Sequence, residues 1–265
     1  MISNNKENPK VFRDFLLKED INTEFVGKQI YCYNVTDSTN NEAKKHSDLP
    51  EGTVFLAKKQ TAGRGRKGRE WKSDHTGLWF SVLLKPDIAP ETVFQITLII
   101  GIAVSRVISG SKIKWPNDIV LGNKKVCGIL TEMSTSGNKV NYVIAGVGIN
   151  VNTEVFPDDI ITIATSLYVE TGKKHSNEKL LSRLCEEIEF IYKKFLKSGF
   201  SALRDEYMNN CITLNREVVI HTATDSYTGT ATDIDENGEL IVKTKSGELN
   251  VLSGEVSVRG IFGYI

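Results

Sequence analysis

The amino-acid sequence predicts an α+β fold, in which a sheet packed with helices is followed by a small β-barrel. A chain of 265 residues lies near the upper limit for one hydrophobic core, so one large domain with a small addition is expected. After Leu214 the pattern changes to short alternating runs separated by tight turns. We therefore divide the chain into a leader (1–28), a larger domain (29–214) and a terminal β-domain (215–265).

The first elements of the larger domain are three strands and one short helix. Strands are expected over 29–35, 53–59 and 78–84, where β-branched and aromatic residues are frequent. The capping residues 37–40 precede good helix formers and mark a helix start between the first two strands. The leader is polar and mildly helical over 14–23, and we expect it to lie on the outside.

A long helix, a series of strands and a second long helix follow. Pro90 opens the first helix, because proline is tolerated in a first turn and apolar residues then recur at three-four spacing up to Val104. The strands between turns are expected at 113–115, 119–121, 125–133 and 140–147. Asn177 caps the second helix, whose apolar face consists of Leu180, Leu181, Leu184, Ile188, Ile191, Tyr192 and Phe195.

The terminal β-domain is expected to begin near Asn215. Its short runs are separated by Glu236-Asn237-Gly238 and by Lys245-Ser246-Gly247. Asn-Gly and Ser-Gly between strand-like runs indicate tight hairpins, and about fifty residues of this pattern are typical of a small β-barrel.

The charge balance and the cysteine pattern exclude several classes of protein. Thirty-three Lys and Arg residues balance 33 Asp and Glu residues, whereas proteins that coat nucleic acid need a basic excess. The longest nearly apolar run, 96–108, is shorter than the ~20 residues of a membrane span, and the polar N-terminus lacks a signal-peptide pattern. Neither CxxC pairs nor metal-ligand spacings occur, so we expect reduced thiols, no metal-ligating residues, no membrane partner and a cytoplasmic location.

The strongest local signal is a basic, glycine-rich segment from Gln60 to Trp71. Four cations fall within the six residues 64–69, and three glycines let the backbone approach a ligand closely. N–H groups in such a loop form an anion-binding nest, and arginine binds phosphate or carboxylate through paired hydrogen bonds. The glycines also match GxGxxG, but no apolar helix follows, which argues against a dinucleotide fold. A solvated surface loop is the alternative for this segment alone.

Two further segments carry polar groups at turns. Residues 113–119 contain Trp-Pro-Asn-Asp, which favours a type I turn between strands and would present Asn117 and Asp118 beside Lys114. A basic turn at 124–125 leads into the next strand. Taken singly, each is better explained as a turn than as a site.

Taken together and in this order, four segments resemble the signature series of biotin protein ligases. They are Ser38 to Asn40, Gly63 to Arg69, Lys114 to Asp118 and Lys125 to Gly128. The similarity runs from about Tyr31 to the C-terminus and implies a mixed-sheet catalytic domain with an SH3-like C-terminal β-barrel. It also implies the reaction: biotin is joined to the α-phosphate of MgATP, and the biotinyl group then passes to a lysine of a biotin carboxyl carrier protein, as in acetyl-CoA carboxylase.

The resemblance further implies roles for the residues that match in position. The biotin head group would be held by Ser38, Thr39, Asn40 and Gln60. The carboxylate and phosphate would meet Arg64, Gly65 and Arg66, with Gly63, Arg69 and Gly128 in the same binding segments. Asn117 and Asp118 would face the adenylate and the metal ion, Lys125 the acyl-phosphate and Trp71 the adenine. The expected catalytic residues are Arg66, Asp118 and Lys125.

Such a reaction needs fixed cations rather than a nucleophilic side chain. A carboxylate and a triphosphate must meet, and their repulsion has to be offset by cations and Mg²⁺. The attacking atoms belong to biotin and then to the acceptor lysine. We also expect the loop 63–69 to be mobile when empty, because crowded cations have little to pair with, and ordered over the adenylate.

Other functions stay open at this point. Lipoate–protein ligases and octanoyl transferases share the fold implied here, although the sequence lacks an RRxxGGG-like segment and a corresponding cysteine. A nucleic-acid-binding module could use the loop 63–69, but only Trp71 and Trp79 supply nearby aromatic rings. A non-catalytic adaptor is the third alternative. About thirty residues precede the region of similarity, fewer than a winged helix-turn-helix needs, so we expect no specific DNA binding; a homodimer is left open.

Overall fold

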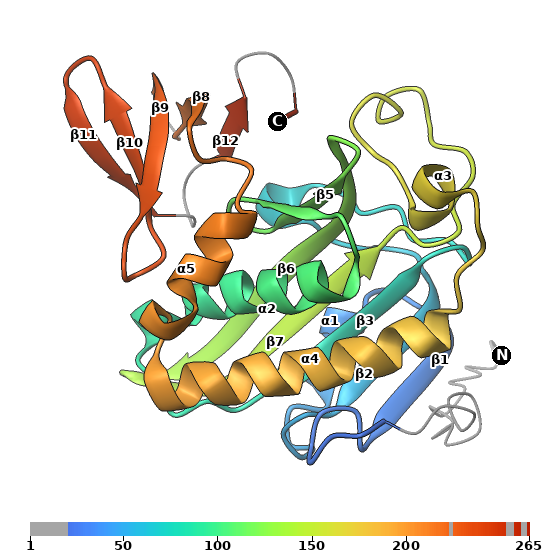
Figure 1. Cartoon of the computed structure of the whole chain (residues 1–265). Coiled ribbons are helices and arrows are strands. Elements are labelled where there is room, and N and C mark those ends of the chain that lie inside the picture. Colours follow the sequence, from blue (N-terminus) through green and yellow to red (C-terminus); the bar gives the residue numbers. More distant parts are fainter. Residues whose placement is uncertain (1–20, 223–224, 253–256, 261–263) are drawn as a thin grey trace, which may run out of the picture.

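The computed structural model describes residues 21–222, 225–252, 257–260 and 264–265 (Figure 1). The larger part is built on one seven-stranded mixed sheet in the order β1-β2-β3-β7-β6-β5-β4. Only β1 and β2 run parallel, and the other neighbours are antiparallel. The strands are β1 (Ile30–Thr36), β2 (Val54–Gln60), β3 (Leu78–Leu84), β4 (Lys112–Lys114), β5 (Asp118–Leu121), β6 (Lys124–Ser136) and β7 (Lys139–Ile149).

The helices cover the two faces of this sheet unequally. Helices α2 (Val93–Val107) and α4 (Asn177–Ser198) pack together over one face, and α1 (Thr39–Lys45) alone lies on the other (Figure 1). Alternate strand residues point to opposite faces, so Val54, Val82 and Val143 join the α2 side, whereas Phe55, Leu83 and Ile144 join the α1 side. Because α1 has only seven residues, it covers little of its face of the sheet, and loops and a cavity occupy the rest.

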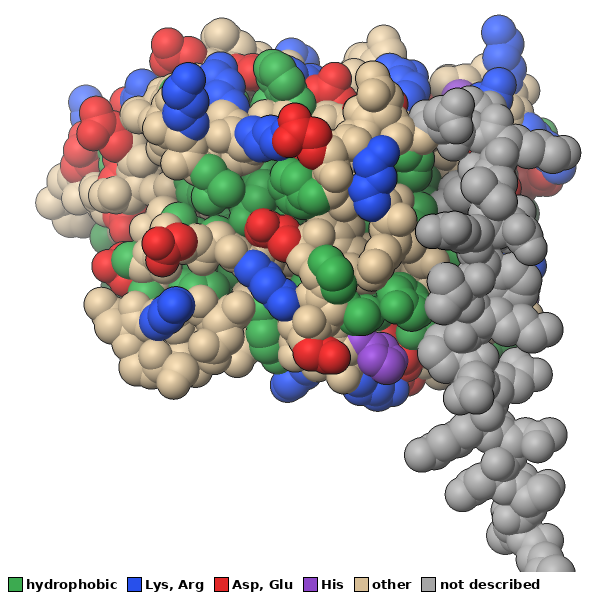
Figure 2. Space-filling view, turned by 90° about the horizontal axis from the view of Figure 1, so that it is seen from below, with side chains coloured by type: hydrophobic (Ala, Val, Ile, Leu, Met, Phe, Trp, Pro, Cys, Tyr) green, Lys and Arg blue, Asp and Glu red, His purple; other side chains and the backbone are tan. Residues whose placement is uncertain are grey.

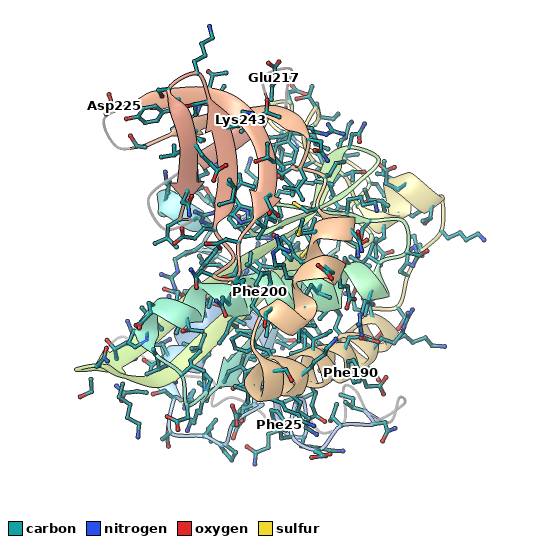
Figure 3. The ribbon with its side chains drawn as sticks, turned by 60° about the vertical axis from the view of Figure 1, so that its left-hand side comes forward. Phe25, Phe190, Phe200, Glu217, Asp225 and Lys243 are labelled. Atoms are coloured by element: carbon teal, nitrogen blue, oxygen red, sulfur yellow. The ribbon has the colours of Figure 1, made fainter. Side chains whose placement is uncertain are left out.

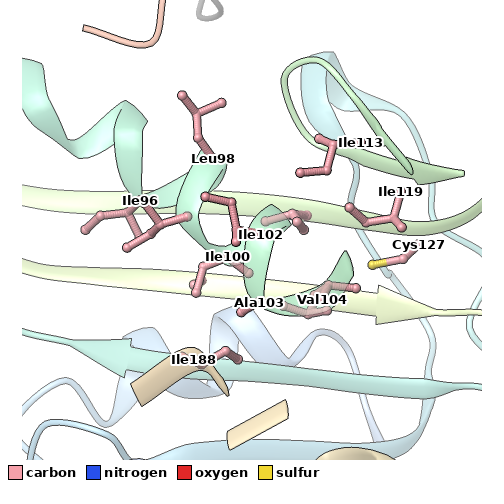
Figure 4. Packing of buried hydrophobic residues seen from close by; sticks show 14 of the residues in the cluster. Ile96, Leu98, Ile100, Ile102, Ala103, Val104, Ile113, Ile119, Cys127 and Ile188 are labelled. Atoms are coloured by element: carbon pink, nitrogen blue, oxygen red, sulfur yellow. The ribbon is translucent and has the colours of Figure 1, made fainter. Parts of the chain in front are cut away.

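Helix α2 is the centre of the hydrophobic core (Figure 4). Together with the 3₁₀ turn η2 (Pro90–Thr92), it forms a stretch, Pro90–Val107, that is long and apolar enough to cross a membrane by length and composition. The length of the run 96–108 therefore does not exclude a span. Its burial argues against a membrane span instead, because 67% of this stretch is buried and Ile96, Leu98 and Ile100 pack in the core.

The C-terminal β-domain is a separate antiparallel sheet. Its described strands are β8 (Arg216–His221), β9 (Ser226–Ile234), β10 (Leu240–Thr244), β11 (Gly247–Val251) and β12 (Ser257–Gly260), in the order β11-β10-β9-β8-β12. Figure 3 shows this sheet, with Lys243 on it, at the opposite end of the molecule from Phe25 and Phe190. The predicted α+β class, with a mixed sheet and a small terminal β-domain, is confirmed.

A hairpin turn fastens the β-domain to the larger part. The Trp115 indole Nε1 donates to the carbonyl of Gly238 at 3.1 Å, and the Gln95 amide donates to the carbonyl of Asn237 at 3.1 Å. On the other side Arg204 pairs with Asp233 at 2.6 Å. The turn 236–238, expected as a hairpin signal, thus also docks the two parts. The boundary predicted near Asn215 falls between α5 (Ser201–Asn210) and β8 and stays a prediction.

Several local expectations need correction. The N-cap of α4 is Ser176, whose Oγ accepts from Lys179 N at 3.1 Å, because Asn177 instead donates to the carbonyl of Gly77. The turn opened by Pro90 is 3₁₀ rather than α-helical. Helices α3 (Leu167–Thr171) and α5 were not expected, since both are short. The helical tendency of 14–23 falls largely on residues 1–20, which lie outside the described residues, and 21–23 are not helical.

The chain before β1 is held to α4 by one carboxylate. Glu189, which is only 6% exposed, accepts hydrogen bonds from the backbone N–H groups of Glu24, Phe25 and Val26 at 2.7–2.9 Å. Burial alone would raise the pKa of Glu189, but these three bonds and Lys193 hold it below its ordinary value of 4.5.

Replacing Glu189 with glutamine should destabilise the fold in a pH-dependent way. A carboxylate whose pKa is lowered on folding stabilises the native state above pH 4.5, and this contribution is lost as the pH falls through the folded pKa. We expect E189Q to lower the free energy of unfolding by about 1–3 kcal/mol at pH 7, with a smaller loss at pH 4. Urea unfolding of E189Q and of the exposed control E217Q tests this; equal losses for both variants would contradict it.

Candidate active site

A cavity of about 1050 Å³ opens on the α1 face of the mixed sheet. The basic loop, the turn 115–117, the segment 153–164 and Tyr264 line it. It brings together nearly all the residues that the sequence singled out: Ser38, Thr39, Asn40, Gln60, Arg64, Gly65, Arg66, Arg69, Trp71, Asn117, Asp118, Lys125 and Gly128. Gly63 lies outside the cavity. A Cβ there would sit 2.3 Å from the carbonyl oxygen of Trp71, so glycine is needed for the close approach of the two backbone segments.

Three glycines form the floor of the cavity and let other side chains lie directly on the sheet. Gly128 of β6 pairs with Gly148 of β7, and both lie under Trp71. A Cβ on Gly148 would come within 2.6 Å of the Trp71 indole nitrogen, and one on Gly146 within 2.2 Å of Asn40 Oδ1. Real Cβ atoms do not approach so closely, so alanine at either position would displace a site residue.

One end of the cavity presents uncharged hydrogen-bonding groups. The Ser81 hydroxyl lies 2.6 Å from Asn40 Oδ1 and 2.7 Å from the Thr39 hydroxyl, while Gln60 Oε1 accepts from Thr39 N at 2.8 Å. Ser38, the N-cap of α1, makes no side-chain cap bond and lines the same end. All of these residues except the half-buried Gln60 are almost fully buried. Such a cluster suits a neutral polar ligand group that can take up several fixed hydrogen bonds.

The other end is charged and is organised by Asp118. Its Oδ1 lies 2.6 Å from the Lys125 ammonium, and its Oδ2 accepts from the Tyr264 hydroxyl at 2.5 Å. Burial alone would raise the pKa of Asp118, yet Lys125, Lys114 and these hydrogen bonds hold it below its ordinary value. Asp118 therefore stays ionised at neutral pH and fixes the Lys125 ammonium.

Arg66 is half-buried and interacts with this carboxylate. Its guanidinium donates to Asn117 Oδ1 at 3.1 Å. Burial lowers the pKa of Arg66, Asp118 opposes that effect, and Arg69 adds to it. A guanidinium that is poorly hydrated in this way gains more than an exposed one when an anion arrives.

The cavity is positive although the whole chain is neutral. Seven Lys and Arg residues line it against four Asp and Glu residues. Elsewhere the charges are mixed, as Figure 2 shows for one face, where acidic and basic side chains are interspersed. The excess positive charge favours an anionic ligand beside the neutral, hydrogen-bonding end.

The basic loop is folded back on itself and is partly paired. Gly65 N donates to the carbonyl of Arg69 at 2.7 Å, across a 3₁₀ turn. The Arg64 guanidinium pairs with Glu132 at 2.6 Å, and Glu132 also accepts from Asn40 at 2.7 Å. The expectation that these cations have little to pair with is therefore wrong for Arg64 and Arg66; the mobility of the loop stays a prediction.

Several residues that line the cavity or hold its lining side chains carried no signal in the sequence. Ser81 has the pattern of an ordinary strand residue, and Glu132 that of a solvated one. Tyr264 lies 146 positions from Asp118, so no local pattern connects them. The apolar segment around Phe156 and Ile160 resembles an ordinary loop. The predicted turn at 115–117 is present. Lys114 and Asp118 are backbone strand partners on either side of it, and the Trp115–Pro116 peptide bond is cis.

Comparisons with known proteins identify the family. The model described as "Biotin/lipoate A/B protein ligase family" matches residues 30–150, and "Biotin protein ligase C terminal domain" matches residues 213–259. The chain is 34% identical over 248 residues to the bifunctional ligase/repressor BirA of Bacillus subtilis, covering 90% of this chain and 76% of that protein. It is 30% identical to the biotin–[acetyl-CoA-carboxylase] ligase of Paracoccus denitrificans, covering 85% and 98%.

A solved structure agrees with these matches. The biotin protein ligase of Aquifex aeolicus in complex with biotin and ATP superimposes with a TM-score of 0.79 at 33% identity, covering 88% of this chain and 99% of that one. Fold and site thus define a protein ligase of the biotin/lipoate class. Within that class, the chain belongs to the biotin protein ligase family. The prediction of an enzyme of this family is confirmed, and its Aquifex aeolicus relative binds the two expected ligands, biotin and ATP.

Filling the cavity floor should impair biotin binding without unfolding the protein. In G146A the new methyl group would displace Asn40 and disrupt the bonds that link it to Ser81 and Glu132. We expect a loss of roughly tenfold or more in biotin affinity, because each broken buried hydrogen bond has a cost of that order. Titration calorimetry measures it.

Gly101 of α2 provides the matched control for this variant. A Cβ there would meet its neighbours at ordinary contact distances of 3.7–3.9 Å, so G101A should bind biotin like the parent. Unchanged affinity in G146A would show that Asn40 does not contact biotin.

Proposed function

We propose that this chain activates biotin as biotinyl-AMP, with release of pyrophosphate, and then transfers the biotinyl group to one lysine of a biotin carboxyl carrier protein. The observation that carries the proposal is the division of one cavity into a neutral polar end and a cationic end. A ligand with an uncharged head and an anionic tail fits the two ends at once, and a nucleotide triphosphate supplies the second anion.

The neutral end suits the ureido group of biotin. Its carbonyl and two N–H groups need both donors and acceptors, and Thr39, Asn40 and Gln60 offer both kinds within one hydrogen-bonded cluster. Ser38 and Ser81 complete the cluster. Biotin placed there would direct its valeryl carboxylate past Trp71 toward the cations.

The cationic end suits the meeting of carboxylate and α-phosphate. Lys125 is fixed by Asp118 and lies over the Trp71 ring, 4.8 Å from its centroid, so its charge is held in place before reaction. Arg66 is held by Asn117 on the opposite side. Preorganised cations lower the repulsion between the two anions and stabilise charge that develops in the transition state. The adenine would lie against Trp71 or the apolar segment near Phe156.

Mg²⁺ would bind to this site together with ATP rather than to the protein alone. The described part of the chain contains no group of three His, Cys, Asp or Glu residues placed to hold a metal. Mg²⁺ commonly uses one or two carboxylates together with substrate phosphates, and Asp118, with Asn117 beside it, would supply the protein side. When bound, the ion would neutralise phosphate charge. The chain's own residues still orient biotin and present Lys125 and Arg66.

In the transfer step the nucleophile is a lysine of the carrier protein, so the site must admit that lysine and needs no nucleophilic side chain of its own. The acceptor amine attacks the carbonyl carbon of the mixed anhydride, and AMP leaves. The loop 63–69 would shield that anhydride from water until the carrier arrives. The names of the relatives support a carboxylase carrier domain as the acceptor, and we place the reaction in the cytoplasm.

Biotin-dependent exchange of labelled pyrophosphate into ATP tests the first step. The purified chain should catalyse this exchange with biotin and not with lipoate or octanoate, because the neutral polar end matches a ureido group. No exchange with biotin at saturating MgATP, with folding verified by circular dichroism, would sink the proposal. Exchange with lipoate alone would move the chain to the lipoate branch of the class.

Removing either partner of the central ion pair should slow adenylation. We expect K125A and D118A to lose roughly 10²–10³ in exchange rate, since a positioned charge at a reacting phosphate is worth about that much. Lys139, exposed at the start of β7, provides the control K139A, which should behave like the parent. A loss below about threefold in K125A or D118A would mean that its role is misassigned.

The loop cation Arg66 should affect retention of the intermediate more than its formation. In R66G the contact with Asn117 and any contact with the adenylate are lost, so the closed loop is weakened. After a single turnover, filtration should recover free biotinyl-AMP from R66G at least about tenfold faster than from the parent. Equal retention would mean that the loop is not a lid and that Arg66 acts only in bond formation.

A further inference from the structure

Among the described residues of the C-terminal β-domain, Tyr264 lines the cavity. Tyr264 lines the cationic end, and its hydroxyl donates to Oδ2 of Asp118 at 2.5 Å. The sequence motifs of the site all lie before residue 129, so Tyr264 stands apart from them.

The two oxygens of Asp118 are divided between two partners. Oδ1 faces the Lys125 ammonium at 2.6 Å, and Oδ2 takes the Tyr264 hydroxyl. A carboxylate held at one oxygen can still rotate, because its terminal torsion is broad. A second hydrogen bond at the other oxygen fixes the carboxylate plane, and Lys125 is fixed with it.

The Tyr264 ring makes a second contact at the same end. The Lys114 ammonium lies 4.2 Å from the ring centroid, within the range of a cation–π interaction. Lys114 is 7% exposed and is the backbone strand partner of Asp118 across the turn 115–117. Tyr264 thus contacts both charged residues that bracket this turn.

Docking of the β-domain does not depend on Tyr264. The turn 236–238 is fastened by Trp115 and Gln95, and Arg204 binds Asp233 independently. A residue needed only to hold the two parts together would have no reason to reach a buried carboxylate in the cavity.

We propose that Tyr264 is a positioning residue for adenylation: its hydroxyl orients Asp118, and through Asp118 the Lys125 ammonium, at the reacting phosphate. The inference rests on the proposed function. It makes the C-terminal β-domain part of the ATP side of the active site. The ring of Tyr264, over Lys114, closes that side of the cavity.

Two substitutions separate the hydroxyl from the ring. Y264F removes only the hydroxyl, and we expect kcat for biotin-dependent pyrophosphate exchange to fall roughly tenfold to a hundredfold, the usual effect of a hydrogen bond to a charged group. The KM for ATP and the calorimetric Kd for biotin should stay within about twofold of the parent. Y264L also removes the ring over Lys114, so its KM for ATP should rise as well.

The control is Y227F, at a half-exposed tyrosine of β9 in the same β-domain, which should match the parent in every measurement. A merely structural role would lower the melting temperature of Y264F and weaken biotin and ATP together, and that pattern would overturn the inference. Parent-like kcat in Y264F would overturn it too. If the parent itself shows no exchange, the proposed function fails; if the parent is active and Y264F equals it, only this inference fails.

Discussion

The site depends on a stretch of sheet without side chains. Gly128, Gly146 and Gly148 keep one face of β6 and β7 bare, and Asn40 and Trp71 settle onto it from α1 and the basic loop. The cavity lies along this bare face, and its two ends present different polar groups to a ligand. The opposite face of the same strands packs against α2 in the hydrophobic core. The cavity and the core around α2 therefore lie on opposite faces of the same strands.

Electrostatics supplies the second requirement. The chain carries no net charge, yet the cavity concentrates an excess of cations around the carboxylate of Asp118, whose side chain is only 15% exposed. Without that carboxylate Lys125 and Lys114 would repel each other, and neither would hold a defined place. With it, one ammonium is aimed into the cavity at neutral pH. The cost of burying Asp118 is offset by two short contacts, one of which reaches in from the C-terminal β-domain.

Much of this could be predicted from the sequence, for reasons that differ between elements. Strand β3 follows from its apolar, aromatic and β-branched residues and helix α2 from three-four spacing, whereas the basic loop follows from an unusual density of cations and glycines. The N-cap of α4 was misplaced by one residue because Ser176 and Asn177 are both good caps, and only the contact of Asn177 with Gly77 decides between them. Ser81, Glu132 and Tyr264 could not be found, since their roles arise from tertiary neighbours. The length of its apolar run could not distinguish α2 as a membrane span from α2 as a core helix, whereas its burial favours the core helix.

The central claim is that one cavity holds biotin and ATP together and joins them. It is tested most directly by mixing the chain with equimolar biotin and MgATP, without any carrier, and quantifying the products by mass spectrometry. Protein-bound biotinyl-AMP should approach one equivalent per chain, with an equal amount of pyrophosphate and no ADP. Release of ADP and phosphate, or a nucleotide product that forms equally well without biotin, would contradict it.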